Sequence, residues 1–132
     1  MAVTDADLLA LAHRAARNSY SPYSGFPVGA ALLTEAGETI TAANVENASY
    51  GLTNCAERSA VFRMVAEAGP GARVVACAIA GPGAAPLPPC GACRQVLHEF
   101  GCTRVVLEDD AGDPLVLDLA DLLPHAFGPG DL

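Results

Sequence analysis

Two short stretches, Asn54-Cys55-Ala56-Glu57-Arg58 and Pro88-Pro89-Cys90-Gly91-Ala92-Cys93, organise this sequence. Each has the composition of a helix start, and together they carry three thiols and one carboxylate. A structural zinc ion is normally held by four protein ligands, whereas a catalytic zinc ion keeps one position open for water. Three cysteines beside one glutamate therefore indicate a catalytic zinc site, and the rest of the chain is expected to form a pocket over it.

Apolar periodicity and turn residues on either side of these stretches predict alternating helices and strands. Helices are expected at about residues 5–18, 55–68, 90–100 and 121–127 (the last a short helix or a turn), and strands at 28–33, 39–44, 73–80, 103–107 and 114–119. The connections at 34–38 and 109–113 are too short for a parallel crossover, so each joins an antiparallel pair. The sum is an α/β fold in a single domain, 1–132, with a five-stranded mixed sheet and helices on both faces.

The two helix starts are expected to meet. Right-handed crossovers through the helices that begin near Cys55 and Cys90 place their N-terminal ends at one edge of neighbouring strands. Cys90 and Cys93 are three residues apart, so their thiols point to one side of a first helical turn. The partial positive charge of a helix N-terminus lowers thiol pKa values, and thiolates are what a metal needs. We therefore expect Zn²⁺ to be bound by Cys55, Cys90 and Cys93.

Two neighbours of Cys55 complete this hypothesis. Glu57 is close enough to reach a zinc-activated water without being a ligand, and there it can take a proton from the water and transfer it to a substrate nitrogen. Arg58, one turn beyond Cys55, is expected to donate to a thiolate sulfur and so offset the charge of three thiolates. The simpler interpretations are a glutamate that favours the first turn of a helix and an arginine on the surface.

Composition narrows the class of partner. The net charge of −8 disfavours a nucleic acid, which basic residues would have to neutralise, so a neutral small molecule is expected. No apolar run reaches the roughly 18 residues of a membrane span. Five cysteines without a signal-peptide pattern argue against a disulfide framework and favour a cytoplasmic protein. Cys77 and Cys102, the two outside the motifs, are expected to pack in the core.

The second motif also fits another class of protein. Pro89-Cys90-Gly91-Ala92-Cys93 at a helix start is typical of a thioredoxin-type redox site. The third cysteine and its nearby carboxylate favour the metal site, and a redox motif usually follows the first strand rather than the third. A thiol-redox protein and a non-catalytic, zinc-stabilised module remain the alternatives from other classes.

The two motifs together match the zinc deaminase signature, in which Cys or His, any residue and Glu are followed by Pro-Cys-x-x-Cys. That signature is a known property of the enzyme class, not a consequence of the spacing. Over nearly its whole length the chain resembles the small, homotetrameric, three-cysteine cytidine deaminases. The further stretches that carry the resemblance are Ser21-Pro22-Tyr23-Ser24, Phe26-Pro27-Val28-Gly29-Ala30-Ala31-Leu32, Asn44-Val45-Glu46-Asn47-Ala48-Ser49-Tyr50-Gly51, Cys93-Arg94-Gln95-Val96 and Leu122-Leu123-Pro124-His125-Ala126-Phe127.

The resemblance implies a three-layer α-β-α cytidine deaminase-like fold and a hydrolase of pyrimidine salvage. Zinc held by Cys55, Cys90 and Cys93 would activate the water that attacks C4 of cytidine or 2′-deoxycytidine. Glu57 would shuttle its proton to N3 and then to the leaving amine, giving uridine or 2′-deoxyuridine and ammonia. A related cytosine nucleoside is the alternative substrate.

The resemblance also implies where the substrate lies. Asn44 and Glu46 would hydrogen-bond the ribose 3′-hydroxyl, and a site built for a hydroxyl rejects analogues that leave its polar groups unpaired. Phe26 would pack on the substrate, and backbone groups around Ala56 would meet the edge of the base. Phe127 would reach into the pocket of a neighbouring subunit and stack on the base, so the homotetramer would have shared active sites.

Overall fold

The computed structural model describes residues 2–132. Its helices are α1 Asp5–Ala16, α2 Ala56–Ala68, α3 Gly91–Glu99 and α4 Leu119–Leu122, and its strands are β1 Gly29–Thr34, β2 Thr39–Ala43, β3 Val74–Ala80, β4 Arg104–Glu108 and β5 Pro114–Asp118. The five strands form one sheet in the order β2-β1-β3-β4-β5. Only the β3–β4 pair is parallel among these neighbours, so the predicted mixed sheet and its two antiparallel hairpins are confirmed.

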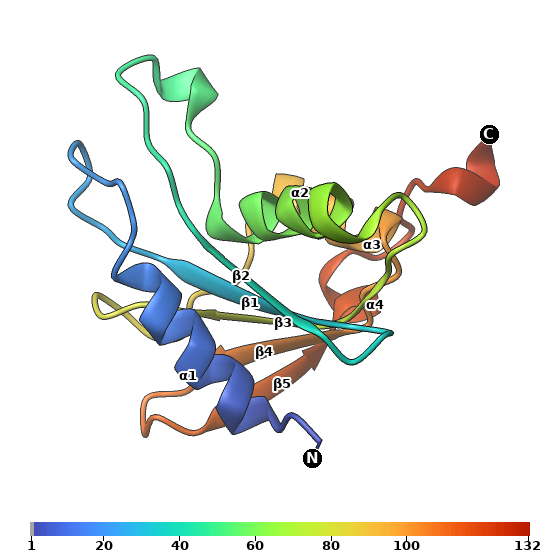
Figure 1. Ribbon diagram of the computed structural model, residues 1–132, viewed down its shortest axis with the longest axis horizontal. Helices are drawn as coiled ribbons and strands as arrows, with labels where there is room; N and C mark the ends of the chain where they lie inside the picture. Colours follow the sequence, from blue (N-terminus) through green and yellow to red (C-terminus); the bar gives the residue numbers. More distant parts are fainter. Residues whose placement is uncertain (1) are drawn as a thin grey trace.

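The sheet is the middle of three layers (Figure 1). Helix α1 covers one face, and α2, α3 and α4 cover the other. Each face has its own apolar core. The smaller core lies under α1 and is centred on Leu8, Ala12 and Val106, and the larger core lies under α2 and α3 and includes Met64 and Leu97. Cys77 and Cys102 are buried in the larger core, as predicted.

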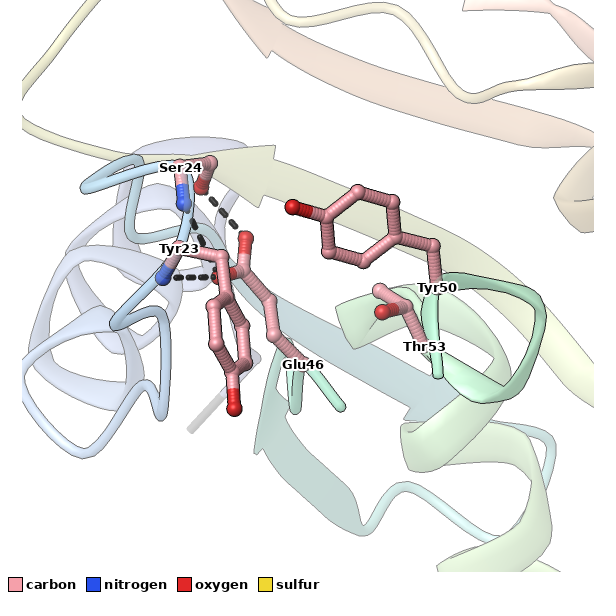
Figure 2. Close-up of a pocket in the computed structure, with 5 residues that line it drawn as sticks. All are labelled: Tyr23, Ser24, Glu46, Tyr50 and Thr53. Carbon is pink, nitrogen blue, oxygen red and sulfur yellow. Dashed lines mark hydrogen bonds between the residues drawn. The ribbon is translucent and has the colours of Figure 1, made fainter. Parts of the chain in front are cut away.

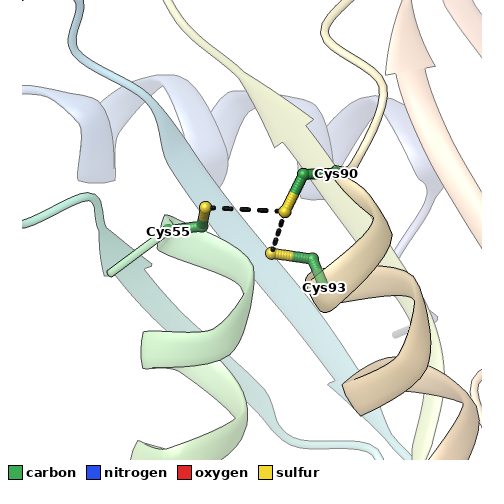
Figure 3. A group of neighbouring side chains, drawn as sticks. All are labelled: Cys55, Cys90 and Cys93. Atoms are coloured by element: carbon green, nitrogen blue, oxygen red, sulfur yellow. Dashed lines mark hydrogen bonds between the residues drawn. The ribbon is translucent and has the colours of Figure 1, made fainter. Parts of the chain in front are cut away.

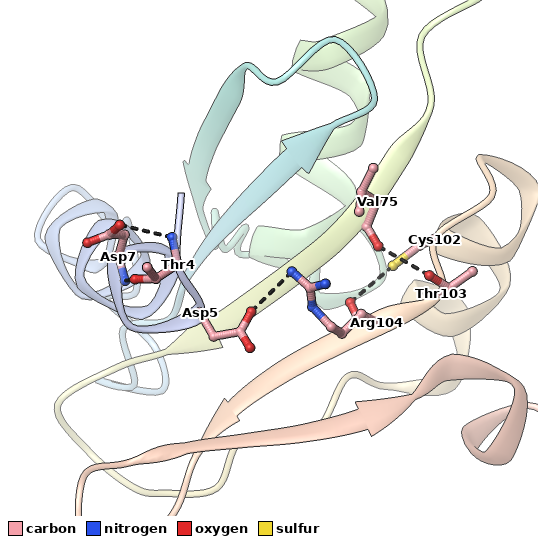
Figure 4. Close-up of polar contacts among 7 residues, drawn as sticks. All are labelled: Thr4, Asp5, Asp7, Val75, Cys102, Thr103 and Arg104. Carbon is pink, nitrogen blue, oxygen red and sulfur yellow. Dashed lines mark hydrogen bonds and ion pairs between the residues drawn. The ribbon is translucent and has the colours of Figure 1, made fainter. Parts of the chain in front are cut away.

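Helix α1 begins where its capping residues predict. Thr4 and Asp7 form a reciprocal capping box, in which the Thr4 amide donates to Asp7 Oδ2 at 2.9 Å and the Asp7 amide donates to Thr4 Oγ1 at 3.0 Å. The Arg104 guanidinium of β4 lies 3.1 Å from Asp5 Oδ1 (Figure 4). A partly exposed ion pair of this kind stabilises a fold by about 1 kcal/mol at most. It therefore orients the first turn of α1, while the apolar face of the helix provides the stability.

The backbone of α1 lies directly on the start of β1. A Cβ atom added to Gly29 would come within 1.8 Å of the Ala12 carbonyl oxygen and 2.6 Å of the Ala16 amide nitrogen. These neighbours are backbone atoms, so no side-chain rotation relieves the clash. Only glycine at this position allows the helix to approach the sheet this closely.

Replacing Gly29 with alanine should therefore destabilise the protein by about 3 kcal/mol, the upper end of what overpacking a core costs. The midpoint of urea unfolding, measured at fixed protein concentration, should fall accordingly. Gly71→Ala is the matched control, because nothing lies within 4 Å of a Cβ at that position. Equal unfolding midpoints for the two variants would contradict the close approach of α1.

The C-terminal helix lies earlier in the chain than predicted. The sequence favoured a helix or turn at 121–127, but α4 spans Leu119–Leu122 and follows β5 without a loop. It begins there because the Asp118 carboxylate accepts a hydrogen bond from the Ala120 amide at 3.2 Å and so caps the helix. Pro124 prevents it from continuing, because proline has no amide hydrogen to donate.

Other differences are small. Helix α1 ends at Ala16 rather than near residue 18, a shift that is common at helix ends. The tail at 128–130 contributes to a single 3-10 turn, η2, at Pro129–Asp131. The Asp131 carboxylate accepts a hydrogen bond from the Gly128 amide at 2.8 Å and holds this turn closed. Among residues 2–132, no helix is both long enough and apolar enough to cross a bilayer.

Candidate active site

The two cysteine motifs meet at the N-terminal ends of α2 and α3. Cys55 is the N-cap residue of α2 and Cys90 is the N-cap residue of α3, each with an extended backbone. Both helices are crossovers that pack side by side on the same face of the sheet, so their first turns lie next to each other. The fold therefore brings together two stretches that are more than 30 residues apart in the chain.

The three thiols of these motifs form a compact group (Figure 3). Cys55 Sγ lies 3.8 Å from Cys90 Sγ, and Cys90 Sγ lies 3.4 Å from Cys93 Sγ. A tetrahedral zinc ion with Zn–S bonds of about 2.3 Å requires sulfur atoms about 3.8 Å apart. The group thus has the dimensions of a zinc site with three protein ligands. Within residues 2–132 it is the one cluster of potential metal-binding side chains of this size.

The environment of Cys55 favours its thiolate. Arg58 Nη2 donates to Cys55 Sγ at 3.3 Å. Hydrogen bonding to Cys93 and to Arg58 lowers the pKa of the Cys55 thiol to about 5. In the part of the chain that the structure describes, the Nε atom of Arg58 is buried without a hydrogen-bond partner. The guanidinium therefore contacts the sulfur cluster through Nη2 and not through Nε.

Glu57 is the one buried carboxylate beside this cluster. Only 5% of its surface is exposed, and burial raises the pKa of its carboxyl group. A carboxylate whose pKa is raised is a stronger base, which favours its use as a proton acceptor in general acid–base catalysis. Glu57 also lines the cavity above the thiols, so a molecule in that cavity lies within its reach.

The cavity has a volume of about 230 Å³ and opens beside the thiols. It brings together residues from five parts of the chain. Those relevant to a ligand are Phe26, Asn44, Cys55, Ala56, Glu57 and Cys90, joined by apolar wall residues such as Ile79 and Leu87. Glu57, two of the three clustered thiols and most of the residues proposed for binding therefore face one space, while Cys93 is buried beside Cys90.

Two of the residues proposed for binding lie outside this cavity. Glu46 lines an adjacent hollow of about 410 Å³ together with Tyr23, Ser24 and Tyr50 (Figure 2), and Thr53 is shared by both spaces. Phe127 is not among the residues that line the cavity of its own chain. Its side chain is 60% exposed, and its carbonyl oxygen accepts a hydrogen bond from Gln95 Nε2 at 2.8 Å.

Sequence reasoning assigned no role to Arg94, although it shapes the approach to the site. Its guanidinium donates to the Pro89 carbonyl oxygen at 2.8 Å and to the Leu122 carbonyl oxygen at 2.7 Å. It thus ties the segment that ends at Cys90 to helix α4. In the sequence, the only indication of this role was the position of Arg94 next to Cys93. Both of its acceptors are backbone carbonyl oxygens, which every residue has, so a sequence cannot identify them.

The five cysteines should differ in reactivity according to this arrangement. Burial raises the pKa of Cys77 and brings that of Cys102 to about 11, so neither should react quickly at neutral pH. Treatment with a zinc chelator should expose Cys55 and Cys90 to a thiol reagent such as dithionitrobenzoate, whereas Cys93 is buried and its pKa is raised by its hydrogen bond to Cys55 and by burial. Two thiols per chain should then titrate rapidly, and all five should titrate after unfolding in guanidinium. Rapid reaction of five thiols in the chelated, folded protein would contradict the burial of the other three.

Comparison with known proteins gives a consistent result. A family model described as the cytidine and deoxycytidylate deaminase zinc-binding region matches residues 2–109. The chain is 48% identical over 128 residues to the cytidine deaminase of Halalkalibacterium halodurans, with 95% of each chain covered. It is 45% identical over 121 residues to that of Mycobacterium tuberculosis, covering 92% of this chain and 87% of the other. The crystal structure of cytidine deaminase from Burkholderia pseudomallei has a TM-score of 0.85 and 48% identity, covering 94% of this chain and 99% of that one.

Proposed function

The chain belongs to the cytidine deaminase family of zinc-dependent aminohydrolases, and on that premise we propose how its residues deaminate cytidine and 2′-deoxycytidine. The supporting observation is a single cavity bordered by the thiols of Cys55 and Cys90, the buried carboxylate of Glu57, an amide and a phenyl ring, with the third thiol, that of Cys93, buried beside Cys90. A thiol-redox site needs two cysteines and no carboxylate, so this combination favours hydrolysis. The whole chain, 1–132, acts as one deaminase domain.

Cys55, Cys90 and Cys93 hold the zinc ion, and Arg58 offsets the charge of their thiolates. When bound, the ion supplies a water molecule that is nucleophilic at neutral pH. Glu57 takes a proton from this water and gives it to N3 of cytosine as the oxygen adds to C4. Glu57 then takes the remaining proton from the new C4 hydroxyl and gives it to the exocyclic amine, so that the C4–N bond breaks, ammonia leaves and C4 becomes the carbonyl of uridine. Burial suits Glu57 to this role because it raises the pKa of the carboxyl group and so makes the carboxylate a stronger base.

Phe26, Asn44 and Ala56 bind the nucleoside within the same cavity. Phe26 packs on the substrate, the backbone at Ala56 meets the base, and Asn44 acts with Glu46 on the ribose 3′-hydroxyl. The position of Asn44 and Phe26 on the cavity wall supports this assignment. Purified protein should convert cytidine to uridine and ammonia in equal amounts, followed by the fall in ultraviolet absorbance, with one zinc per chain. Protein that holds zinc but leaves cytidine unchanged would refute the proposal.

Phe127 acts in the pocket of a neighbouring subunit of a homotetramer. Its exposed ring and its absence from the wall of its own cavity support this role. The idea predicts complementation between two impaired variants. Glu57→Gln chains keep Phe127, and Phe127→Ala chains keep Glu57, so hybrids of the two contain pockets with both groups. Mixing after reversible dissociation should restore activity well above the sum of the separate variants.

Two outcomes would contradict the shared site. One is sedimentation of a fully active monomer, and the other is a hybrid no more active than its parents. The control is Glu67→Gln, a change at an exposed residue of α2, and chains with this change should show no gain in activity from mixing.

We further infer that the enzyme serves pyrimidine salvage in a reducing, cytoplasmic compartment. The support comes from the site, because zinc binding requires Cys55, Cys90 and Cys93 as free thiolates, and oxidising compartments favour disulfides instead. The Sγ atoms of Cys90 and Cys93 lie only 3.4 Å apart, so oxidation would compete directly with metal binding.

A further inference from the structure

The carboxylate of Glu46 is held by a turn that precedes Phe26 (Figure 2). Glu46 Oε1 accepts hydrogen bonds from the amides of Tyr23 at 3.0 Å and Ser24 at 3.1 Å. Glu46 Oε2 accepts a hydrogen bond from the Ser24 hydroxyl. The bonds from Ser24 lower the pKa of Glu46, so it is an acceptor at neutral pH. A carboxylate has about four acceptor sites, and three are filled, which leaves one on Oε2.

The direction of the bond from Ser24 is fixed by its other neighbour. The amide of Phe26 donates to Ser24 Oγ at 3.0 Å. Because this amide can only donate, the single hydrogen of the Ser24 hydroxyl is free to go to Glu46. Ser24 therefore connects the carboxylate of Glu46 to the backbone of Phe26, whose ring lines the catalytic cavity.

The other side of Phe26 is held by Asn44. Asn44 Nδ2 donates to the Phe26 carbonyl oxygen at 2.9 Å, and Asn44 Oδ1 accepts from the Val28 amide at 2.9 Å and from the Ser19 hydroxyl. A carbonyl on one side and an amide on the other allow only one orientation of the side-chain amide. Both acceptor sites of Oδ1 are then filled, and one N–H of Nδ2 remains to donate to a ligand.

Together these bonds leave one donor on Asn44 and one acceptor on Glu46. A hydroxyl group is the ligand that accepts from the first and donates to the second. Residues 44 and 46 are two apart in an extended segment, so their side chains lie on one side of it. Thr53 lines both the cavity that Asn44 faces and the hollow that Glu46 faces, so the two groups border connected spaces.

We propose that Ser24 is a positioning residue, whose hydroxyl aims the free acceptor of Glu46 at the ribose hydroxyl and joins it to Phe26. This proposal rests on the proposed function, in which Asn44 and Glu46 bind the 3′-hydroxyl of the nucleoside. Ser24 acts through Glu46 and does not itself touch the substrate. Without its hydroxyl, Glu46 Oε2 loses the bond that fixes its direction, and discrimination for a 3′-hydroxyl falls.

The test compares kcat/KM for cytidine with kcat/KM for 3′-deoxycytidine in the zinc-loaded protein. Ser24→Ala should lower this ratio about tenfold, the effect of weakening one hydrogen bond to a charged group. Ser24→Thr keeps the hydroxyl and should hold the ratio within about twofold of the unmodified protein. Ser49→Ala is the matched control and should leave the ratio unchanged, because this serine is exposed and its hydroxyl makes no hydrogen bond within residues 2–132.

Glu46→Gln and the double variant separate the sugar-binding role of Glu46 from the positioning role of Ser24. Glu46→Gln should lower the ratio at least as much as Ser24→Ala, and adding Ser24→Ala to it should lower the ratio no further. If Glu46→Gln reduces the ratio and Ser24→Ala reduces kcat/KM equally for both substrates, Ser24 only supports the loop and the positioning role is wrong. If Glu46→Gln leaves the ratio unchanged, the sugar-binding role of Glu46 is wrong, and the role of Ser24 is lost with it.

Discussion

Replacing Glu57 with glutamine should lower kcat for cytidine by about 10³- to 10⁴-fold while the protein keeps its zinc. Glutamine has nearly the same shape but cannot carry a proton between the water, N3 and the leaving amine. General acid–base catalysis by one residue accounts for about 10²- to 10⁴-fold in rate, and Glu57 serves two proton transfers, so the upper part of that range applies. The measurement is steady-state deamination followed by absorbance, beside zinc determined per chain.

The control for this variant is Glu67→Gln on the same helix. Glu67 is half exposed and pairs with Arg63 at 2.9 Å, so its replacement should change kcat by less than about twofold. A Glu57→Gln protein that deaminates cytidine at the unmodified rate would exclude Glu57 as the proton carrier. If that variant had lost zinc as well as activity, Glu57 would instead be needed to hold the metal.

Replacing Cys90 with alanine should remove both the zinc and the activity. Two thiols give a metal site of far lower affinity, and the loss of a ligand weakens binding more than the 10- to 100-fold typical of residues behind the ligands. Deamination should fall by at least about 10⁴-fold, because the nucleophile is supplied by the bound ion. Cys90 is exposed, so its truncation leaves no buried gap, and the fold should persist.

The matched control is Cys102→Ala, which removes a buried thiol outside the cluster. It should reduce stability by about 1 kcal/mol and leave zinc content and kcat unchanged. A Cys90→Ala protein that retains one tightly bound zinc per chain would show that the metal is held elsewhere. Circular dichroism of the apo form would separate metal loss from unfolding.

Much of the fold could be predicted from the sequence because local signals agreed with one another. The run at 73–80 is almost entirely apolar, which indicates a strand covered on both faces, and β3 is the central strand. Apolar periodicity predicted a helix from about residue 5, and α1 begins at Asp5. At 114–122 the signals conflicted, because Leu115, Leu117 and Leu119 alternate like a strand while Leu119, Leu122 and Leu123 are spaced like a helix. Asp118, which ends one element and caps the next, resolved the conflict in a way that periodicity alone did not indicate.

Part of the candidate site could likewise be predicted from the sequence, and part could not. The proximity of Cys55 to Cys90 and Cys93 follows from the right-handedness of two crossovers, which can be inferred from the order of the helices and strands alone. The contacts of Ser19, Ser24 and Thr53 do not follow from any such rule. These residues lie in segments without periodicity. Ser19 bonds to Asn44, 25 residues away, and Ser24 bonds to Glu46, 22 residues away. Their roles depend on how loops fold over the sheet, which propensity and spacing do not determine.

The N-termini of two helices meet at one group of sulfur atoms, and this arrangement influences which substrates can enter the site. Three thiolates around a divalent cation carry a net charge of −1, and Glu57 adds another −1 when ionised. Arg58 contributes +1, and the two helix ends contribute about +0.5 each. The centre is thus close to electroneutral as a whole, although every group in it is charged or strongly polar. An uncharged nucleoside can occupy it without bringing a counter-ion, whereas any ligand with a net charge would upset a balance that the fold has already reached.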